Sequence, residues 1–299
     1  EHLADVLALR IEGNHINDEI ADTGDKKDFY WWFQQRIDYS EKKHGFYNWR
    51  HLNSVMDGLK SFAPKLSVAN INLSFIKDFE LHLLKKGNHP NTVADKLMRV
   101  KIIVREIVNA GYMKYHLNPF LRYQIKHKKR DRLRLTHAQL RSLEIVELEN
   151  PNVVRARDMY VFSFYCAGLR FGDLARLKKE NVIEGRLVYQ MNKGKNNRSV
   201  RLNDGSLRIL KKYALEEGDR IFNLDIFWGD EDAQINSKNH IMNVHLKKAC
   251  KAAEIPEVTF HTARHSVADL AIKKKIGMRD LKDILGHTKI QTTEIYAKS

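Results

Sequence analysis

The side chains best suited to chemistry stand near the end of the chain. His261 and Arg264 lie three residues apart, His287 follows a glycine, and Tyr296 is close to the last residue. Arg170 stands upstream in a Gly-Leu-Arg turn. Guanidinium groups match the geometry of phosphate oxygens, and a phenol oxygen can serve as a nucleophile. The set therefore predicts an attack on a phosphodiester at a site that needs no metal.

The common motifs for metals and nucleotides are missing from the sequence. It contains no CxxC pair, no HExxH, no GxxxxGK[ST] loop and no GxGxxG. His261 and His265 are four residues apart and could share a helix face, but a zinc site there would need a further ligand. We therefore favour a packing or capping role for His265 behind the site, and predict neither a metal nor a cofactor.

Composition points to a polyanionic partner. The chain has 299 residues, 43% of them hydrophobic, and a formal net charge of +15. This length predicts two domains with ordinary cores. The charge favours nucleic acid as the partner, with an anionic membrane surface as the alternative. We expect the two cysteines, Cys166 and Cys250, to be buried free thiols in a reducing cytoplasm.

The first 121 residues are predicted to form a bundle of about four helices. Apolar residues recur there at helical spacing in four segments, which begin near Phe29, Trp49, Ile76 and Val93. Gly111 follows the fourth segment and is a typical signal for a helix end.

A basic segment separates this region from the rest of the chain. Seven of the thirteen residues from 122 to 134 are Lys or Arg, and no apolar period continues through them. We predict an extended interdomain linker that contacts DNA phosphates, with a merely solvated linker as the alternative. The predicted DNA contacts are Lys126, Lys128, Lys129, Arg130, Arg132, Arg134 and, further along the chain, Lys195.

The remaining residues are predicted to be mainly helical with one β-hairpin. Strand-like runs at 186–191 and 198–202 flank a Gly- and Asn-containing gap. Thr136 is a plausible N-cap. The expected helices span 136–148, 158–166, 172–179, 204–217, 238–253, 262–274, 278–285 and 289–297.

Taken in order, these motifs resemble the tyrosine recombinases, the integrase and Xer-type family of site-specific DNA recombinases. The resemblance is carried by AGLRFGDLARL around Arg170, NKGKNNRSVRL around Lys193, HTARH at 261–265 and LGHTKIQTTEIYAK at 285–298. It implies a mainly α fold with a helical core-binding, SAM-like domain at 1–121, a linker at 122–135 and a catalytic domain at 136–299. The catalytic domain would carry a small antiparallel sheet, and about 1–20 would be a flexible or truncated lead-in.

The resemblance also implies roles at the phosphate. Tyr296 would be the nucleophile that forms a 3′-phosphotyrosyl link and frees a 5′-hydroxyl. Arg170 and Arg264 would clamp the phosphate, and His287 would donate to a non-bridging oxygen. Nearby positive charge would favour the phenolate of Tyr296.

Further roles concern protons and support. Lys193 would be the general acid for the leaving 5′ oxygen, with Lys195 as the alternative. His261 would assist proton transfer at the nucleophile, and Asp173 would support the site. Relatives often carry an N-terminal arm-binding domain and a C-terminal segment, which we expect this chain to lack or to have lost.

The expected partner is double-stranded DNA at specific recombination sites. We expect a monomer in free solution and a homotetramer on synapsed DNA, possible accessory DNA-bending proteins, no membrane, and a cytoplasmic, nucleoid-associated location in bacteria. The activity would integrate or excise a mobile element. Two alternatives remain, a type IB topoisomerase-like enzyme that relaxes DNA and a non-catalytic DNA-binding relative.

Overall fold

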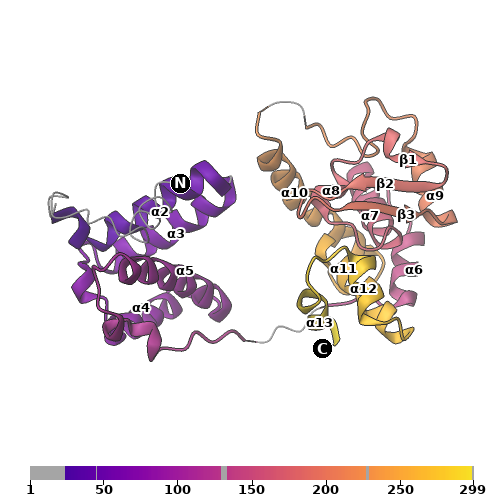
Figure 1. Cartoon of the computed structure of the whole chain (residues 1–299). Helices are drawn as coiled ribbons and strands as arrows, with labels where there is room; N and C mark the ends of the chain where they lie inside the picture. Colours follow the sequence, from indigo (N-terminus) through magenta and orange to yellow (C-terminus); the bar gives the residue numbers. More distant parts are fainter. Residues whose placement is uncertain (1–23, 45, 129–132, 227–228, 298–299) are drawn as a thin grey trace. The chain divides into compact units, whose positions relative to one another are not determined.

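The computed structural model describes residues 24–44, 46–128, 133–226 and 229–297 (Figure 1). The chain divides into two compact units, Glu1–Lys129 and Arg130–Ser299. Each unit buries its own hydrophobic core. The predicted lead-in at 1–20 lies outside the described residues.

The first unit is a helical bundle. Its α-helices are α2 (Phe29–His44), α3 (Phe46–Phe62), α4 (Leu73–Lys85) and α5 (Pro90–Asn109), and its short 3-10 turns are η1 (Gly24–Lys27), η2 (Val68–Asn70), η3 (Tyr115–Leu117) and η4 (Pro119–Leu121). The four predicted helices are confirmed, and Gly111 follows α5 with a φ of +82°. Buried Phe29, Phe33, Phe79 and Ile103 lie in the core between the helices.

The start of the basic linker is fixed to this bundle. Asn91, in the first turn of α5, accepts a hydrogen bond from the backbone N–H of Lys128 at 2.7 Å. Its amide donates to the carbonyl of Lys128 at 2.9 Å. Because both backbone groups of Lys128 are held, the described residues up to 128 belong to the bundle, and they have no regular structure from 123 onward.

The second unit is mainly helical with one small sheet. Its helices are α6 (His137–Ile145), α7 (Pro151–Tyr165), α8 (Phe171–Leu174), η5 (Lys179–Asn181), α9 (Asp204–Tyr213), α10 (Glu231–Ala252), α11 (Phe260–Lys273), α12 (Met278–Leu285) and α13 (Gln291–Ala297). The strands β1 (Val182–Ile183), β2 (Arg186–Gln190) and β3 (Asn197–Arg201) form an antiparallel sheet in that order. Leu187 pairs with Val200 in the β2–β3 register, which confirms the predicted hairpin.

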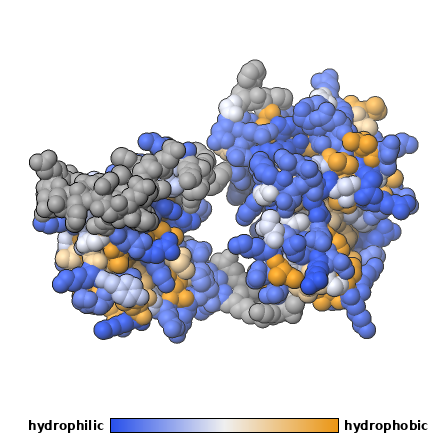
Figure 2. Space-filling view, in the orientation of Figure 1, coloured by the Kyte–Doolittle hydropathy of each residue, from blue (hydrophilic) through white to orange (hydrophobic). Residues whose placement is uncertain are grey.

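Helix α7 lies at the centre of the second core. Its residues Met159, Tyr160 and Phe162 are fully buried, and α10 packs along it through Leu246. Cys166 and Cys250 are free and buried in the same core, as predicted. Figure 2 shows that the visible surface of both units is mostly hydrophilic. No helix among the described residues is long and apolar enough to cross a membrane.

Several predicted helix bounds were wrong. Helix α7 begins at Pro151 rather than at 158, because Asn150 caps its first turn and proline fits the first helical position. Helix α6 has the predicted Thr136 cap but ends at Ile145 rather than 148, where Val146 turns to an extended conformation.

The segment after Arg170 also differs from the prediction. Helix α8 spans only four residues instead of continuing to 179, and it is followed by a 3-10 turn and the short strand β1, which was not predicted. The backbone N–H of Lys179 donates to Asp219 at 2.8 Å and that of Ile221 to Leu177 at 2.9 Å. These long-range bonds replace the helical ones, and local sequence does not reveal them.

Leu246 and Leu215 offer a matched test of this core. Leu246 is fully buried, whereas Leu215 is 95% exposed. Leu246→Ala is expected to lower the free energy of unfolding of the second unit by about 2–5 kcal/mol, because it leaves a cavity. Leu215→Ala should change it by less than about 0.5 kcal/mol. Urea denaturation followed by circular dichroism checks both, and equal effects would contradict the described packing.

Candidate active site

The site is built around the C-terminal end of α12. Gly286 follows this helix in the left-handed region, with a φ of +64°. Its backbone N–H donates to the carbonyl of Asp283 at 3.0 Å, and that of His287 donates to Lys282 at 3.0 Å. The helix therefore ends in a tight reversal that fixes the backbone of His287.

Two arginines donate hydrogen bonds to the last carbonyl groups of α12. Nη1 and Nη2 of Arg198, on β3, donate to the carbonyl oxygens of Asp283 and Ile284. Nη2 of Arg264, on α11, donates to that of Leu285. A helix leaves its last four carbonyls without partners inside the helix, and cations are favoured at this end. All four carbonyls of α12 are thus satisfied, and two guanidinium groups are held in place beside His287.

Arg170 is brought to Arg264 by a glycine. Gly168 has a φ of +71°, and a Cβ built on it would lie 2.6 Å from the Cα of Arg264. The carbonyl of Gly168 accepts from Nη1 of Arg264 at 3.2 Å. Arg170 then occupies the N-cap position of α8 two residues later, where its carbonyl accepts from the N–H of Leu174 at 2.9 Å. Only glycine allows this close approach, so the turn and α11 pack with their backbones in contact.

The guanidinium groups of Arg170 and Arg264 form a site of uncompensated positive charge. Arg264 is only 4% exposed, and burial together with the charge of Arg170 lowers its pKa to about 10. Among the described residues neither arginine is in an ion pair, and Nη1 of Arg170 is buried without a hydrogen-bond partner. Buried donors and charges are costly when unpaired. The arrangement is therefore suited to an anion with several oxygens.

His287 is buried next to this charge. It is 8% exposed, and its Nδ1 lies 2.8 Å from the hydroxyl oxygen of Thr293. Burial, and then the charges of Arg264 and Arg170, lower its pKa to about 4. The ring is therefore neutral near pH 7, and with Thr293 as donor to Nδ1 the proton of the ring lies on Nε2. A neutral ring in this tautomer can still donate one hydrogen bond.

Tyr296 packs among the histidines. It is 5% exposed, and its ring stacks on His287 with a centroid distance of 6.2 Å and an interplanar angle of 8°. The ring of His265 lies 5.4 Å from it and also contacts His261 at 4.6 Å. Tyr296 also interacts electrostatically with Arg264. The structure thus brings the predicted nucleophile to the predicted arginines, and His265 packs directly against Tyr296.

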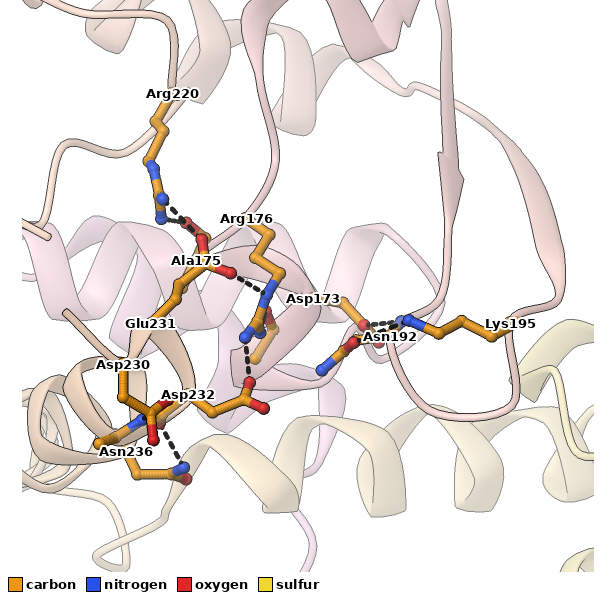
Figure 3. Close-up of polar contacts among 12 residues, drawn as sticks. Asp173, Ala175, Arg176, Asn192, Lys195, Arg220, Asp230, Glu231, Asp232 and Asn236 are labelled. Carbon is orange, nitrogen blue, oxygen red and sulfur yellow. Dashed lines mark hydrogen bonds and ion pairs between the residues drawn. The ribbon is translucent and has the colours of Figure 1, made fainter. Parts of the chain in front are cut away.

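The β2–β3 loop carries the two candidate lysines. Oδ1 of Asp173, on α8, accepts from the backbone N–H of Asn192 at 2.7 Å, and Nζ of Lys195 donates to Oδ1 of Asn192 at 3.2 Å (Figure 3). Asp173 therefore holds the loop, a role the sequence did not specify. Lys193 is exposed, and a Cβ on the neighbouring Gly194 would lie 3.9 Å from Thr288. The loop thus lies beside the His287 turn.

Helix α8 is itself fixed by an ionic cluster. Arg176 contacts Glu231 at 3.0 Å and also Asp232, and Arg220 contacts Glu231 at 2.8 Å (Figure 3). Nη1 of Arg220 donates to the carbonyl of Ala175 at 2.8 Å. These contacts join the end of α8 to the start of α10, so Asp173 and Arg170 stand on a braced element.

The predicted DNA contacts are only partly described. Lys126 and Lys128 are exposed, whereas Arg134 forms an ion pair with Asp269 at 2.8 Å. Lys129, Arg130 and Arg132 lie outside the described residues. The contacts with DNA stay a prediction. Within the described ranges, no group of three or more His, Cys, Asp or Glu residues is placed to hold a metal ion.

Sequence reasoning missed two residues of the site. The sequence predicts only a strand position for Arg198, since an arginine on an exposed hairpin is usually solvated. It gives no role to Thr293, whose contact with His287 depends on the turn between α12 and α13. Neither contact has a local signal in the sequence, except that Thr293 lies close in sequence to His287 and Tyr296.

Family models match both units. The model of the phage integrase family matches residues 133–299, more than half of the chain. The model of the phage integrase SAM-like domain matches residues 28–128.

Individual proteins agree with these models. A tyrosine recombinase of Thermosipho africanus is 33% identical over 169 residues, 54% of this chain and 56% of that protein. The chain therefore spans little more than half the length of this relative. Two solved structures are similar at 17% identity and a TM-score of 0.68. One is a lambda integrase dimer bound to a COC′ core site, with 90% of this chain and 95% of that chain covered. The other is a lambda integrase tetramer bound to a Holliday junction, with 98% and 84% covered.

Gly168→Ala tests the close approach of the two arginine segments. Gly185 is the matched control, since it has a φ of +72° but nothing within 4 Å of an added Cβ. Gly185→Ala should cost about 1–2 kcal/mol of unfolding free energy from backbone strain alone. Gly168→Ala should cost a further ~1–3 kcal/mol from the clash with Arg264. Urea denaturation measures both, and equal losses would contradict the described contact.

The lowered pKa of His287 predicts a dependence of stability on pH. Histidine in an unfolded chain has a pKa of about 6.5, so between about pH 6.5 and 4 the unfolded state binds a proton that the folded state does not. The free energy of unfolding should therefore fall as the pH falls through this window. His287→Asn should flatten this dependence, and His240→Asn, at an exposed position of α10, should not. Urea denaturation at a series of pH values checks this, and an unchanged slope in His287→Asn would contradict it.

Proposed function

Because the chain belongs to the phage integrase family of tyrosine recombinases, we propose that it is a site-specific DNA recombinase. It would cleave and rejoin double-stranded DNA through a 3′-phosphotyrosyl intermediate. The observation that carries the proposal is the pair of uncompensated guanidinium groups of Arg170 and Arg264 beside Tyr296 and His287. A scissile phosphate would supply the negative charge and the oxygens that these donors lack.

In the proposed cleavage step, Tyr296 loses its phenolic proton and its oxygen bonds to phosphorus. The bond from phosphorus to the 5′ oxygen breaks, and that oxygen takes up a proton as the 5′-hydroxyl forms. The phosphotyrosyl bond keeps the energy of the phosphodiester, so a 5′-hydroxyl can attack it and rejoin the strand without ATP.

Charge develops on the non-bridging oxygens during the attack. Arg170 and Arg264 would bind these oxygens, and their orientation is set in advance by the protein. His287, neutral and with its proton on Nε2, would donate a further hydrogen bond. The donor set of two arginines and a histidine performs the neutralisation that divalent ions perform in metal-dependent enzymes.

Lys193 would protonate the leaving 5′ oxygen. Lys195 is the weaker candidate, because its ammonium group is bound to Asn192 and its backbone φ is +53°. Within the described residues no ion pair or hydrogen bond holds the side chain of Lys193, which leaves it available to DNA. The ring contacts from His261 through His265 to Tyr296 support a role for His261 in removing the phenolic proton.

The two units would divide the work. We infer that the first unit is the core-DNA-binding domain and the second the catalytic domain, joined by the basic linker. The lambda integrase structures contain a dimer on a core site and a tetramer on a Holliday junction. By analogy this chain would act as a homotetramer on two synapsed sites, in a cytoplasmic location at the nucleoid, to integrate or excise a mobile element. The matches to integrases and a recombinase do not favour the topoisomerase alternative.

Tyr296→Phe tests the nucleophile. Wild-type protein is incubated in EDTA with nicked suicide duplexes pooled from candidate recombination sites, and covalent DNA complexes that survive SDS are measured. Wild type should form the complex. Tyr296→Phe should lower its yield by at least about a thousandfold, because phenylalanine has no hydroxyl oxygen to bond to phosphorus.

Tyr115→Phe is the matched control, since Tyr115 lies in the first unit and is 69% exposed. It should form the complex as wild type does. A covalent complex that persists in Tyr296→Phe, or one that forms only with added Mg²⁺, would contradict the proposal.

A further inference from the structure

We propose that Arg198 is a positioning residue that holds the lysine loop of the hairpin against the His287 turn, and thereby places the general acid at the leaving oxygen. The inference rests on the proposed function. The foot of the β2–β3 hairpin would thus take part in the cleavage step, although Arg198 itself would contact neither the phosphate nor a nucleobase.

Arg198 binds the end of α12 through both arms of its guanidinium group. Its two Nη atoms donate to two successive carbonyls, those of Asp283 and Ile284. A guanidinium group presents its donors in a rigid fork, so two contacts fix its direction as well as its position. The end of α12 also attracts the charge. The next carbonyl, that of Leu285, is held by Arg264, so the hairpin and the phosphate clamp share one anchoring point.

Only a short stretch of chain separates Arg198 from the loop. Asn197, the first residue of β3, pairs with Gln190, the last residue of β2, and the N–H of Met191 donates to the carbonyl of Asn196 at 2.9 Å. Arg198 therefore stands directly below the loop that carries Lys193. Any displacement of this strand from α12 moves the loop with it.

Packing at the same place allows little slack. A Cβ built on Gly286 would lie 2.7 Å from Sδ of Met191 and 3.4 Å from the side chain of Arg198. The foot of the hairpin thus rests directly on the backbone of the His287 turn. On its opposite side the loop is held by Asp173 through the N–H of Asn192. Asp173 and Arg198 hold the two arms of the loop from different elements, which fixes its direction.

An exposed arginine of a strand is most often solvated, and a charge near DNA can act simply by attracting phosphates. The geometry distinguishes Arg198 from that case, because both Nη atoms are directed at protein carbonyls. Arg201, on the same strand, is exposed, and among the described residues its side chain makes no hydrogen bond or ion pair. It therefore provides a control of equal charge.

The experiment uses the full chain and two nicked suicide duplexes of one sequence that gives a covalent complex with wild type. One duplex has the ordinary 5′ oxygen at the scissile phosphate, and the other has sulfur in its place. A thiol has a pKa of about 8.5, so a sulfur leaving group departs without a proton donor. Breaking the phosphorus–sulfur bond leaves a 5′-thiolate and the same phosphotyrosyl product. The rate of covalent-complex formation is measured on both duplexes in EDTA.

Arg198→Met should form the complex about 100-fold more slowly on the oxygen duplex, since a misplaced general acid loses a contribution of this size. On the sulfur duplex its rate should stay within about threefold of wild type, because no proton is needed there. Lys193→Ala should show the same pattern. Arg198→Lys should resemble Arg198→Met, as one ammonium group cannot bridge two carbonyls in a fixed direction. Arg201→Met should match wild type on both duplexes.

Two results would overturn the inference. An equal loss of rate on both duplexes would show that Arg198 supports the fold or His287 instead of the general acid. The rate of the Arg198→Met variant on the sulfur duplex also reports whether this variant is folded. Wild-type rates in Arg198→Met on the oxygen duplex would show that the contact is dispensable. If no sequence gave a covalent complex with wild type, the proposed function would fail and the inference with it.

Discussion

The capping of α12 by two guanidinium groups is the interaction on which the site depends. The four carbonyls at the end of this helix need partners, and none is available inside the helix. Backbone N–H groups of the following turn donate to the first two of these carbonyls, and Asp283 is the second. Arg198 and Arg264 donate to the last three, so the carbonyl of Asp283 accepts from both the turn and an arginine. Satisfying one helix end thus fixes the hairpin, the second arginine and the backbone of His287 in a single arrangement.

This arrangement explains how a strongly positive site can exist inside a folded domain. Arg264 is oriented by neutral carbonyls and not by carboxylates, so it keeps its full charge for a ligand. The described Asp173 carboxylate is directed at the backbone of Asn192 and not at Arg170. Burial, and then this positive field, lower the pKa of His287 and keep its ring neutral. The energetic cost of gathering these groups is offset only when an anion binds, which links the architecture to phosphodiester chemistry.

Sequence reasoning reached the fold class, the hairpin and most of the helices, because apolar periodicity, the Thr136 cap and the Gly111 stop are local signals. It erred where long-range bonds or a cap decided the outcome, as at the start of α7 and after α8. The four residues proposed for phosphate and nucleophile, Arg170, Arg264, His287 and Tyr296, were found through the order of short motifs, and the structure brings them together. Their roles remain proposals. The grip of Arg198 and the direction of Asp173 depend on which elements pack together, so no spacing in the sequence could reveal them.

The central claim is that Arg170 and Arg264, the second of them oriented by backbone carbonyls, hold a phosphate in line with Tyr296. A structure of the chain with nicked cleavage-site DNA and vanadate, prepared in EDTA, tests it most directly. The account predicts a five-coordinate vanadate with the oxygen of Tyr296 in one apical position. Arg170 and Arg264 should contact its equatorial oxygens while Arg264 keeps its bond to Leu285. A vanadate held by other residues, or Tyr296 directed away from it, would contradict the account.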